Sequence, residues 1–154
     1  MSARRSIGKL LIRPISAGDR NIWAPLWKGY LDFYAKRIPE QTTDFTWKRL
    51  TRTGEIHGFI AVDGAGNGLG LTHYFFHPST STIGGNCYLQ DLFVSPSARA
   101  RGIGRQLIAA VVEAARKKYV AVVYWQTEEF NMTARRLYER VAKRSPFIRY
   151  NIEL

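Results

Sequence analysis

Hydrophobic and polar positions follow two different periods along the chain, and together they predict a mixed α/β fold. Short apolar runs bounded by turn residues predict strands at 10–15, 56–62, 70–76, 88–94, 120–125 and 147–152. Apolar residues at steps of three and four predict helices at 17–38, 43–52, 103–119 and from 131 onward. Gly54 is predicted to stop the second helix, and the turn residues at 63–68 predict a hairpin between the second and third strands. The predicted order is therefore strand, two helices, three strands, helix, strand, helix, strand.

The strand at 88–94 leads into a loop rich in glycine and arginine, and this loop opens the helix at 103–119. The first turn of a helix has unpaired N–H groups and a positive dipole end, so it attracts phosphate. Glycine lets the backbone approach such a ligand, and arginine adds charge-assisted hydrogen bonds. The residues concerned are Arg99, Arg101, Gly102, Gly104 and Arg105. They predict a site for a phosphorylated cofactor, with a tight turn carrying solvated arginines as the alternative.

A second unit of strand, loop and helix begins at 120–125. Asn131 is a residue type that suits a helix N-cap. Tyr138 follows two helical turns later, so both side chains can point to the same side of the helix. The alternative for these two residues is an ordinary N-cap and a packed helical tyrosine.

The two units carry a resemblance to a known family. Their patterns are Arg99-x-x-Gly102-x-Gly104 and Asn131-x-x-Ala134-x-x-Leu137-Tyr138. In this order they resemble the cofactor motifs of the GNAT superfamily of N-acetyltransferases, and the likeness covers nearly the whole chain. The resemblance implies one domain over 1–154 with the GNAT fold, an α/β (α+β) architecture. Its central sheet is mixed, mostly antiparallel and flanked by helices, with a splayed fourth and fifth strand.

The resemblance also implies acetyl-CoA as the cofactor and assigns residues to it. The strand backbone at Leu92, Phe93 and Val94 would pair with the pantetheine arm, as would the side chain of Asn131. The glycine loop would hold the pyrophosphate. The residues implied there are Arg99, Arg101, Gly102, Ile103, Gly104 and Arg105, with Arg135 from the following helix. The hydroxyl of Tyr138 would protonate the departing CoA thiolate.

The closest subgroup by resemblance is the diamine or polyamine acetyltransferases, suggested by Tyr88-Leu89-x-Asp91-x-Phe93-Val94. In those enzymes a glutamate stands where this chain has Gln90, and glutamine is no useful proton acceptor. Strand alternation predicts that Asp91 points to the opposite face from Tyr88 and Gln90, so Asp91 does not simply replace the glutamate. Gln90 is therefore expected to orient a water or the acceptor amine, and Glu128 or Glu129 is an alternative carboxylate.

Aromatic residues of the first helix are candidates for the acceptor pocket. Trp27, Tyr30 and Tyr34 would hold an ammonium group by cation–π contact, beside Asp91. The alternative is that these aromatics belong to the hydrophobic core.

The net charge of +11 and the pI near 10.2 raise the question of nucleic acid. Basic residues occur in every segment rather than in one tail, and the cofactor phosphates account for part of the excess, so nucleic acid is disfavoured. No apolar run is long enough for a membrane span, which leads us to expect a cytoplasmic protein. The single cysteine, Cys87, excludes an internal disulfide, and the three histidines lack a zinc-binding spacing, so no metal is expected.

Three classes of function remain. The first is acetyl transfer from acetyl-CoA to a primary amine, of a small molecule, polyamine or lysine-like acceptor, by direct attack in a ternary complex. The second, motivated by Gln90, is a CoA-binding sensor or assembly module, and the third is a basic nucleic-acid-binding protein. A last strand and aromatic edges also favour a homodimer.

Overall fold

The computed structural model describes residues 9–154, and its elements follow the predicted order up to the last helix. The strands pair in the order β1-β2-β3-β4-β5, with antiparallel pairs up to β4 and a parallel β4–β5 pair. This confirms the mixed, mostly antiparallel sheet. The elements are β1 (Leu11–Pro14), α1 (Arg20–Phe33), α2 (Glu40–Lys48), β2 (His57–Val62), β3 (Gly68–His77), β4 (Asn86–Val94), α3 (Ile103–Lys117), β5 (Val122–Tyr124) and α4 (Met132–Val141).

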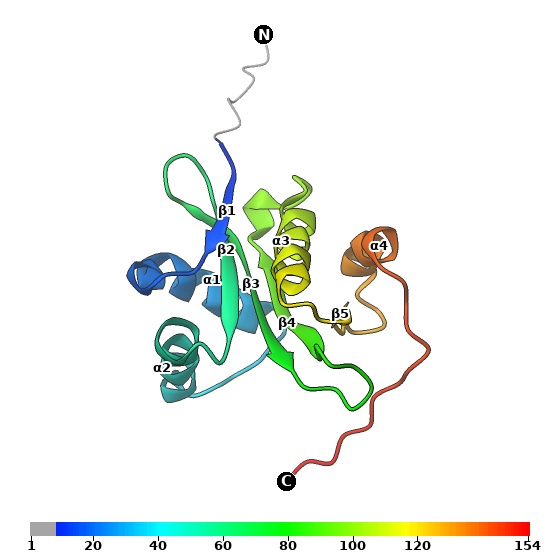
Figure 1. Cartoon of the computed structure of the whole chain (residues 1–154). Coiled ribbons are helices and arrows are strands. Elements are labelled where there is room, and N and C mark those ends of the chain that lie inside the picture. The colour runs from blue at the N-terminus through cyan, green and yellow to red at the C-terminus, as the bar shows by residue number, and fades with distance from the viewer. Residues whose placement is uncertain (1–8) are drawn as a thin grey trace.

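Helices cover both faces of the sheet, with α1 and α2 on one side and α3 and α4 on the other (Figure 1). On the first side, Trp23 and Leu26 of α1 pack against Leu71 and Phe93 of the sheet. On the second side, Val111 and its neighbours from α3 pack against β4. The amphipathic periods of α1 and α3 therefore each bury an apolar stripe against the sheet.

Helix ends differ from the sequence prediction where turn residues intervene. The first helix stops at Phe33 rather than continuing to 38, because Ala35 adopts a positive φ of 50° that no helix continues through. The second helix starts at Glu40, directly after Pro39. It continues through a short π-helical turn and stops at Gly54, whose φ of 67° is the left-handed conformation that glycine favours. The predicted stop at Gly54 is confirmed.

In the middle of its pairing with β3, β4 carries one extra residue. His73 pairs with Asp91, and the next residue of β3, Tyr74, pairs with Leu89. Gln90 therefore has no partner and forms a β-bulge. The bulge interrupts the alternation of side chains in the middle of the strand that leads to the glycine loop.

The bulge makes one sequence prediction wrong. In a regular strand Leu89 and Leu92 would lie on opposite faces, but here both pack on the α3 side of the sheet. Tyr88 and Asp91 both lie on the α1 side beside Tyr30, whose pKa is raised by burial first and further by these two residues. Strict alternation had placed Asp91 away from Tyr88, and the extra residue reverses that placement.

The predicted last strand at 147–152 is also wrong, since the structure has no strand there. The segment after α4 runs extended and away from the sheet (Figure 1). Its apolar side chains are almost fully accessible, with exposed fractions of 91% for Phe147, 86% for Tyr150 and 89% for Ile152. The alternation favours a strand, but a strand also needs a partner edge, and this segment pairs with none within residues 9–154.

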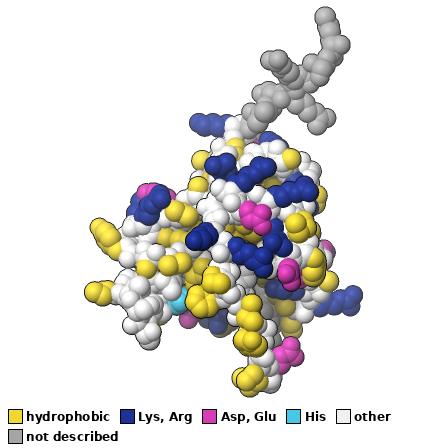
Figure 2. Space-filling view, turned by 90° about the vertical axis from the view of Figure 1, so that its right-hand side faces the viewer, with side chains coloured by type: hydrophobic (Ala, Val, Ile, Leu, Met, Phe, Trp, Pro, Cys, Tyr) yellow, Lys and Arg dark blue, Asp and Glu magenta, His cyan; other side chains and the backbone are white. Residues whose placement is uncertain are grey.

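The surface that carries α4 and the C-terminal segment is strongly basic (Figure 2). Lys and Arg side chains dominate its middle, and hydrophobic side chains follow the projecting lower end. Among the helices of residues 9–154, none has the length and apolar character that crossing a bilayer requires.

Candidate active site

The fourth and fifth strands separate, as the resemblance implies. Their pairing covers only Asn86–Tyr88 with Val122–Tyr124, while β4 continues to Val94. No other strand within residues 9–154 pairs with this edge of β4. The backbone groups of Leu92, Phe93 and Val94 therefore lie on a stretch of edge that a ligand can pair with, as a pantetheine arm requires.

The glycine loop has the backbone geometry expected of an anion-binding turn. Gly102 is the N-cap of α3 with a φ of 76°, a conformation in which a side chain would be strained. Gly104 follows in the first turn, and a Cβ there would point at Leu137 of α4 and Val94 of β4, 3.3 and 3.7 Å away. The first turn of α3 thus faces the gap between β4 and α4. Ile103, predicted for the cofactor, is 2% exposed, and its side chain packs in the core.

The arginines of the loop play different parts. The Nε of Arg99 donates to the carbonyl oxygen of Val94 at 3.1 Å, and its guanidinium lies 5.1 Å from the ring centre of Phe33. Arg99 therefore fixes the loop to the end of β4 and to α1. Arg101 and Arg105 are exposed on either side of Gly102 and remain available to a phosphate.

Asn131 and Arg135 organise the start of α4. Asn131 is its N-cap, as predicted, with Oδ1 accepting from the Ala134 N–H and Nδ2 donating to Thr127 Oγ1 at 3.2 Å. Arg135 donates to the carbonyl of Glu129 and lies 3.4 Å from Glu139 Oε1. The resemblance implies that both residues bind the cofactor; in the structure, their side chains bind the loop after β5.

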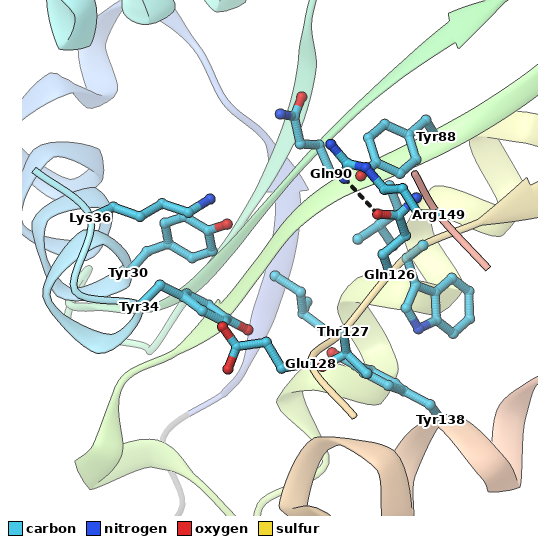
Figure 3. A pocket seen from close by; sticks show the side chains of 13 residues that line it. Tyr30, Tyr34, Lys36, Tyr88, Gln90, Gln126, Thr127, Glu128, Tyr138 and Arg149 are labelled. Atoms are coloured by element: carbon cyan, nitrogen blue, oxygen red, sulfur yellow. Dashed lines mark hydrogen bonds between the residues drawn. The ribbon is translucent and has the colours of Figure 1, made fainter. Parts of the chain in front are cut away.

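A cleft of about 280 Å³ opens where β4 and β5 part (Figure 3). It joins α1, β4, the loop after β5, α4 and the C-terminal segment. The lining residues are Tyr30, Tyr34, Lys36, Tyr88, Leu89, Gln90, Leu92, Trp125, Gln126, Thr127, Glu128, Tyr138 and Arg149. The cleft thus brings together both residues predicted as catalytic, Gln90 and Tyr138.

Tyr138 projects its hydroxyl into the cleft from α4, toward Thr127 and Glu128 (Figure 3). Its ring packs edge-on against Trp125, with 5.4 Å between ring centres. Burial, with a smaller contribution from Tyr34, raises the pKa of Tyr138 to about 12. The phenol therefore keeps its proton throughout the neutral range and can serve as a proton donor in the cleft.

The aromatic residues of α1 divide between the core and the cleft. Trp27 is buried in the core, where its Nε1 donates to Thr43 Oγ1 at 3.3 Å, and it does not line the cleft. Tyr30 and Tyr34 do line it. Tyr34 points toward Glu128 across the cleft, and burial together with the charge of Glu128 raises the pKa of Tyr34 (Figure 3).

Two cations of the cleft were not predicted from the sequence. Lys36 reaches over Tyr30, with Nζ 5.5 Å from the ring centre. Arg149 comes from the C-terminal segment and donates to Gln126 Oε1 at 2.7 Å (Figure 3). Neither belongs to a local motif, so only the fold reveals that they share a cleft with Glu128.

Acetyl-CoA fits the residues present on the α3 side. The free edge of β4, the left-handed Gly102 and the exposed Arg101 and Arg105 supply backbone donors, close approach and positive charge along one strand–loop–helix unit. Leu92 on this edge lines the cleft, as does Tyr138. This arrangement suits an acyltransferase that takes its acyl group from a CoA thioester.

Comparison with known proteins agrees with this class. The model of the Acetyltransferase (GNAT) family matches residues 21–142, so the chain belongs to that family. It is an acyltransferase of the N-acetyltransferase kind. A relative from Saccharomyces cerevisiae, named D-amino-acid N-acetyltransferase HPA3, is 31% identical over 92% of this chain and 89% of its own. A Caenorhabditis elegans thialysine N-epsilon-acetyltransferase is 32% identical over 56% of this chain and 52% of its own.

Solved structures confirm the fold. A crystal structure of a probable acetyltransferase superposes with a TM-score of 0.85 at 24% identity, over 94% of this chain and 97% of the other.

Proposed function

We propose that the protein is a cytoplasmic acetyl-CoA-dependent N-acetyltransferase whose acceptor is a small primary amine that also carries a carboxylate, such as an amino acid. The observation that carries this proposal is the charge pattern of the cleft. Glu128 lies beside Tyr34, while Lys36 and Arg149 supply two cations in the same cleft. An acceptor with an ammonium and a carboxylate group complements both charges.

The chain's own residues suit direct attack of the amine. When bound, acetyl-CoA supplies the acetyl thioester. Glu128 is the carboxylate that faces the cleft and can take a proton from the amine, whereas Gln90 can only donate or accept a hydrogen bond. Tyr138 holds a proton at the cleft for the sulfur that leaves. Of the two carboxylates suggested by the sequence, Glu128 lines the cleft and Glu129 does not.

The acceptor class draws support from the names of the relatives. D-amino acids and thialysine, named for two of them, are amino acids. A polyamine, which carries several positive charges and no carboxylate, would meet like charge at Lys36 and Arg149. We therefore favour an amino-acid acceptor over the polyamine suggested by the sequence patterns.

The acceptor class is tested by thiol release from acetyl-CoA against D-alanine, thialysine, spermidine and n-butylamine. We expect Lys36→Met to raise KM about tenfold for the amino-acid acceptor, since a charge-assisted hydrogen bond contributes about 1.5 kcal/mol or more, and to leave n-butylamine unaffected. Lys28→Met is the matched control, because Lys28 lies on α1 and pairs with Asp32 at 2.7 Å outside the cleft. Equal kinetics of the Lys36 variant and the wild type with amino acids would contradict the proposed acceptor.

A CoA-binding module without transfer is the second candidate, and Gln90 is the observation that favours it. Gln90 sits at the bulge, where the related polyamine enzymes are implied to have a glutamate. The same assay separates the two candidates, because a binding module would take up acetyl-CoA and release no thiol with any acceptor.

We also propose a homodimer in which the C-terminal segment packs on a second copy. Its apolar side chains alternate with polar ones and are exposed in the single chain. They are Phe147, Ile148, Tyr150, Ile152 and Leu154. Burying such a surface against a partner would remove it from water, which is the largest available gain in free energy for this segment.

Light scattering after size exclusion tests the dimer. The full chain is expected to run as two copies, and a chain ending at Arg144 or carrying Ile148→Asp and Ile152→Asp as one copy. A full chain that stays single, or a variant that stays paired, would contradict the role of this segment.

A further inference from the structure

A chain of buried polar groups runs from α1 through β3 to β4, behind the cleft. Trp23 Nε1 lies 2.9 Å from His73 Nε2, and His73 Nδ1 lies 2.9 Å from Asp91 Oδ2. The exposed fractions are 0% for Trp23, 1% for His73 and 7% for Asp91. Polar groups at such depth are costly unless they are hydrogen-bonded, so this chain is a specific arrangement rather than a surface contact.

Trp23 determines where His73 carries its proton. An indole N–H only donates, so His73 Nε2 must accept. The proton of the neutral imidazole is then on Nδ1, from which it donates to Asp91 Oδ2. The side chain of Thr72 donates to the backbone carbonyl of Asp91 at 2.8 Å and holds the same residue from the other strand face.

Asp91 is therefore a buried carboxylate whose position is fixed by hydrogen bonds. Within residues 9–154, no Lys or Arg side chain forms an ion pair with Asp91, and His73, as a neutral donor, does not cancel its negative charge. Tyr30, which lines the cleft, lies next along this path. Trp27 packs between its ring and that of His73, with ring centres 5.1 Å and 5.2 Å away. Burial and then the charge of Asp91 raise the pKa of Tyr30, so its hydroxyl stays protonated. The hydroxyl oxygen can accept a hydrogen bond from a donor in the cleft.

The bulge at Gln90 makes this geometry possible. It turns Asp91 to the α1 side, directly opposite His73 in the strand register. Without the extra residue, Asp91 and Tyr88 would lie on opposite faces and Tyr30 would face no carboxylate.

We propose that Trp23 and His73 are positioning residues for the acceptor site: they fix Asp91 so that its carboxylate, acting through the Tyr30 hydroxyl, orients the ammonium group of the acceptor. This inference rests on the proposed function and adds to it a second anionic determinant besides Glu128. It assigns a role to a buried histidine and tryptophan that touch neither substrate nor cofactor.

The experiment compares Trp23→Phe, His73→Leu and His73→Gln with the wild type, using thialysine as the acceptor. Trp23→Phe keeps a buried ring and loses the N–H, whereas His73→Gln keeps an amide that can donate to Asp91 and accept from Trp23. Ile60→Val, in the same core cluster and also 0% exposed, controls for a general loss of stability. Measured quantities are KM and kcat for the acceptor, the dissociation constant of acetyl-CoA by calorimetry, and the nitrogen NMR shifts of the histidine rings.

We expect Trp23→Phe and His73→Leu to raise KM for thialysine about tenfold, as the loss of a charge-assisted interaction predicts, with the acetyl-CoA constant unchanged. His73→Gln should restore most of the wild-type KM, and Ile60→Val should not change it. The NMR spectrum of the wild type should show His73 neutral and protonated on Nδ1. In Trp23→Phe, His73 should no longer be restricted to that tautomer.

Acceptor kinetics that match the wild type in folded Trp23→Phe and His73→Leu would overturn the inference, as would a His73 protonated on Nε2. Failure of the proposed function has a different signature, because it would appear as absent thiol release in the wild type itself.

Discussion

Replacing Tyr138 with Phe is expected to lower the turnover of acetyl transfer by about a hundredfold, with the affinity for acetyl-CoA unchanged. A positioned general acid contributes roughly that factor or more. The hydroxyl points into the cleft, and burial raises the pKa of Tyr138 to about 12, so the proton is present at every working pH. The phenyl ring retains the packing on Trp125, which confines the change to the proton.

Tyr74→Phe is the matched control for this substitution. Tyr74 is also buried, and burial also raises its pKa to about 12, but it packs on Phe59 away from the cleft. Steady-state thiol release gives kcat, and calorimetry gives the dissociation constant. If Tyr138→Phe and Tyr74→Phe had equal turnover, the phenol would not be the proton donor.

The second large effect is expected for Gly104→Asp, which should weaken acetyl-CoA binding by about a hundredfold. The substituted side chain would enter the gap between α3, β4 and Leu137 of α4, where it meets atoms at 3.3 Å. Its carboxylate would also stand in the first turn of α3, opposing the phosphates that this turn is suited to attract. A loss of about 3 kcal/mol corresponds to this change in affinity.

Gly104→Ala separates the two causes. Its single methyl group meets the flexible end of Leu137, which can move by a few tenths of an ångström, and it adds no charge. We expect the alanine variant to lose much less affinity than the aspartate variant. Calorimetric titration of both, with thermal unfolding to show that they fold, checks this; wild-type affinity in the aspartate variant would refute the assignment of the loop.

The parts of the fold and site that the sequence predicted are those set by local patterns. The loop from Arg99 to Gly104 and the cap at Asn131 are each specified by a few consecutive residues, and both occur where predicted. The hairpin at 63–68 and the stop at Gly54 follow from turn chemistry in the same way. Tyr138 reaches the cleft because its helical position relative to Asn131 is fixed by the period of the helix.

The parts that the sequence did not predict depend on contacts between distant segments. The alternation of residues in the sequence does not reveal the β-bulge at Gln90, and this bulge decides on which side of the sheet Asp91 lies. His73 is 50 residues from Trp23 in the chain and yet accepts its hydrogen bond. The last strand was predicted from alternation alone, although no edge within residues 9–154 receives it.

The charged residues of the cleft also come from segments that are distant in the sequence. Lys36 follows α1, Glu128 follows β5 and Arg149 belongs to the C-terminal segment, so no linear motif joins them. Their meeting place is set by the separation of β4 from β5. The acceptor class could therefore be argued only once the cleft was known.

We propose that this cleft transfers an acetyl group to an amine that bears a carboxylate. The decisive experiment measures thiol release from acetyl-CoA with wild-type protein, in the presence and absence of D-alanine, thialysine and n-butylamine. We expect release that depends on the acceptor and is fastest with an amino acid. Binding of acetyl-CoA without acceptor-dependent thiol release would contradict the proposal. Release that is as fast with n-butylamine as with the amino acids would also contradict it.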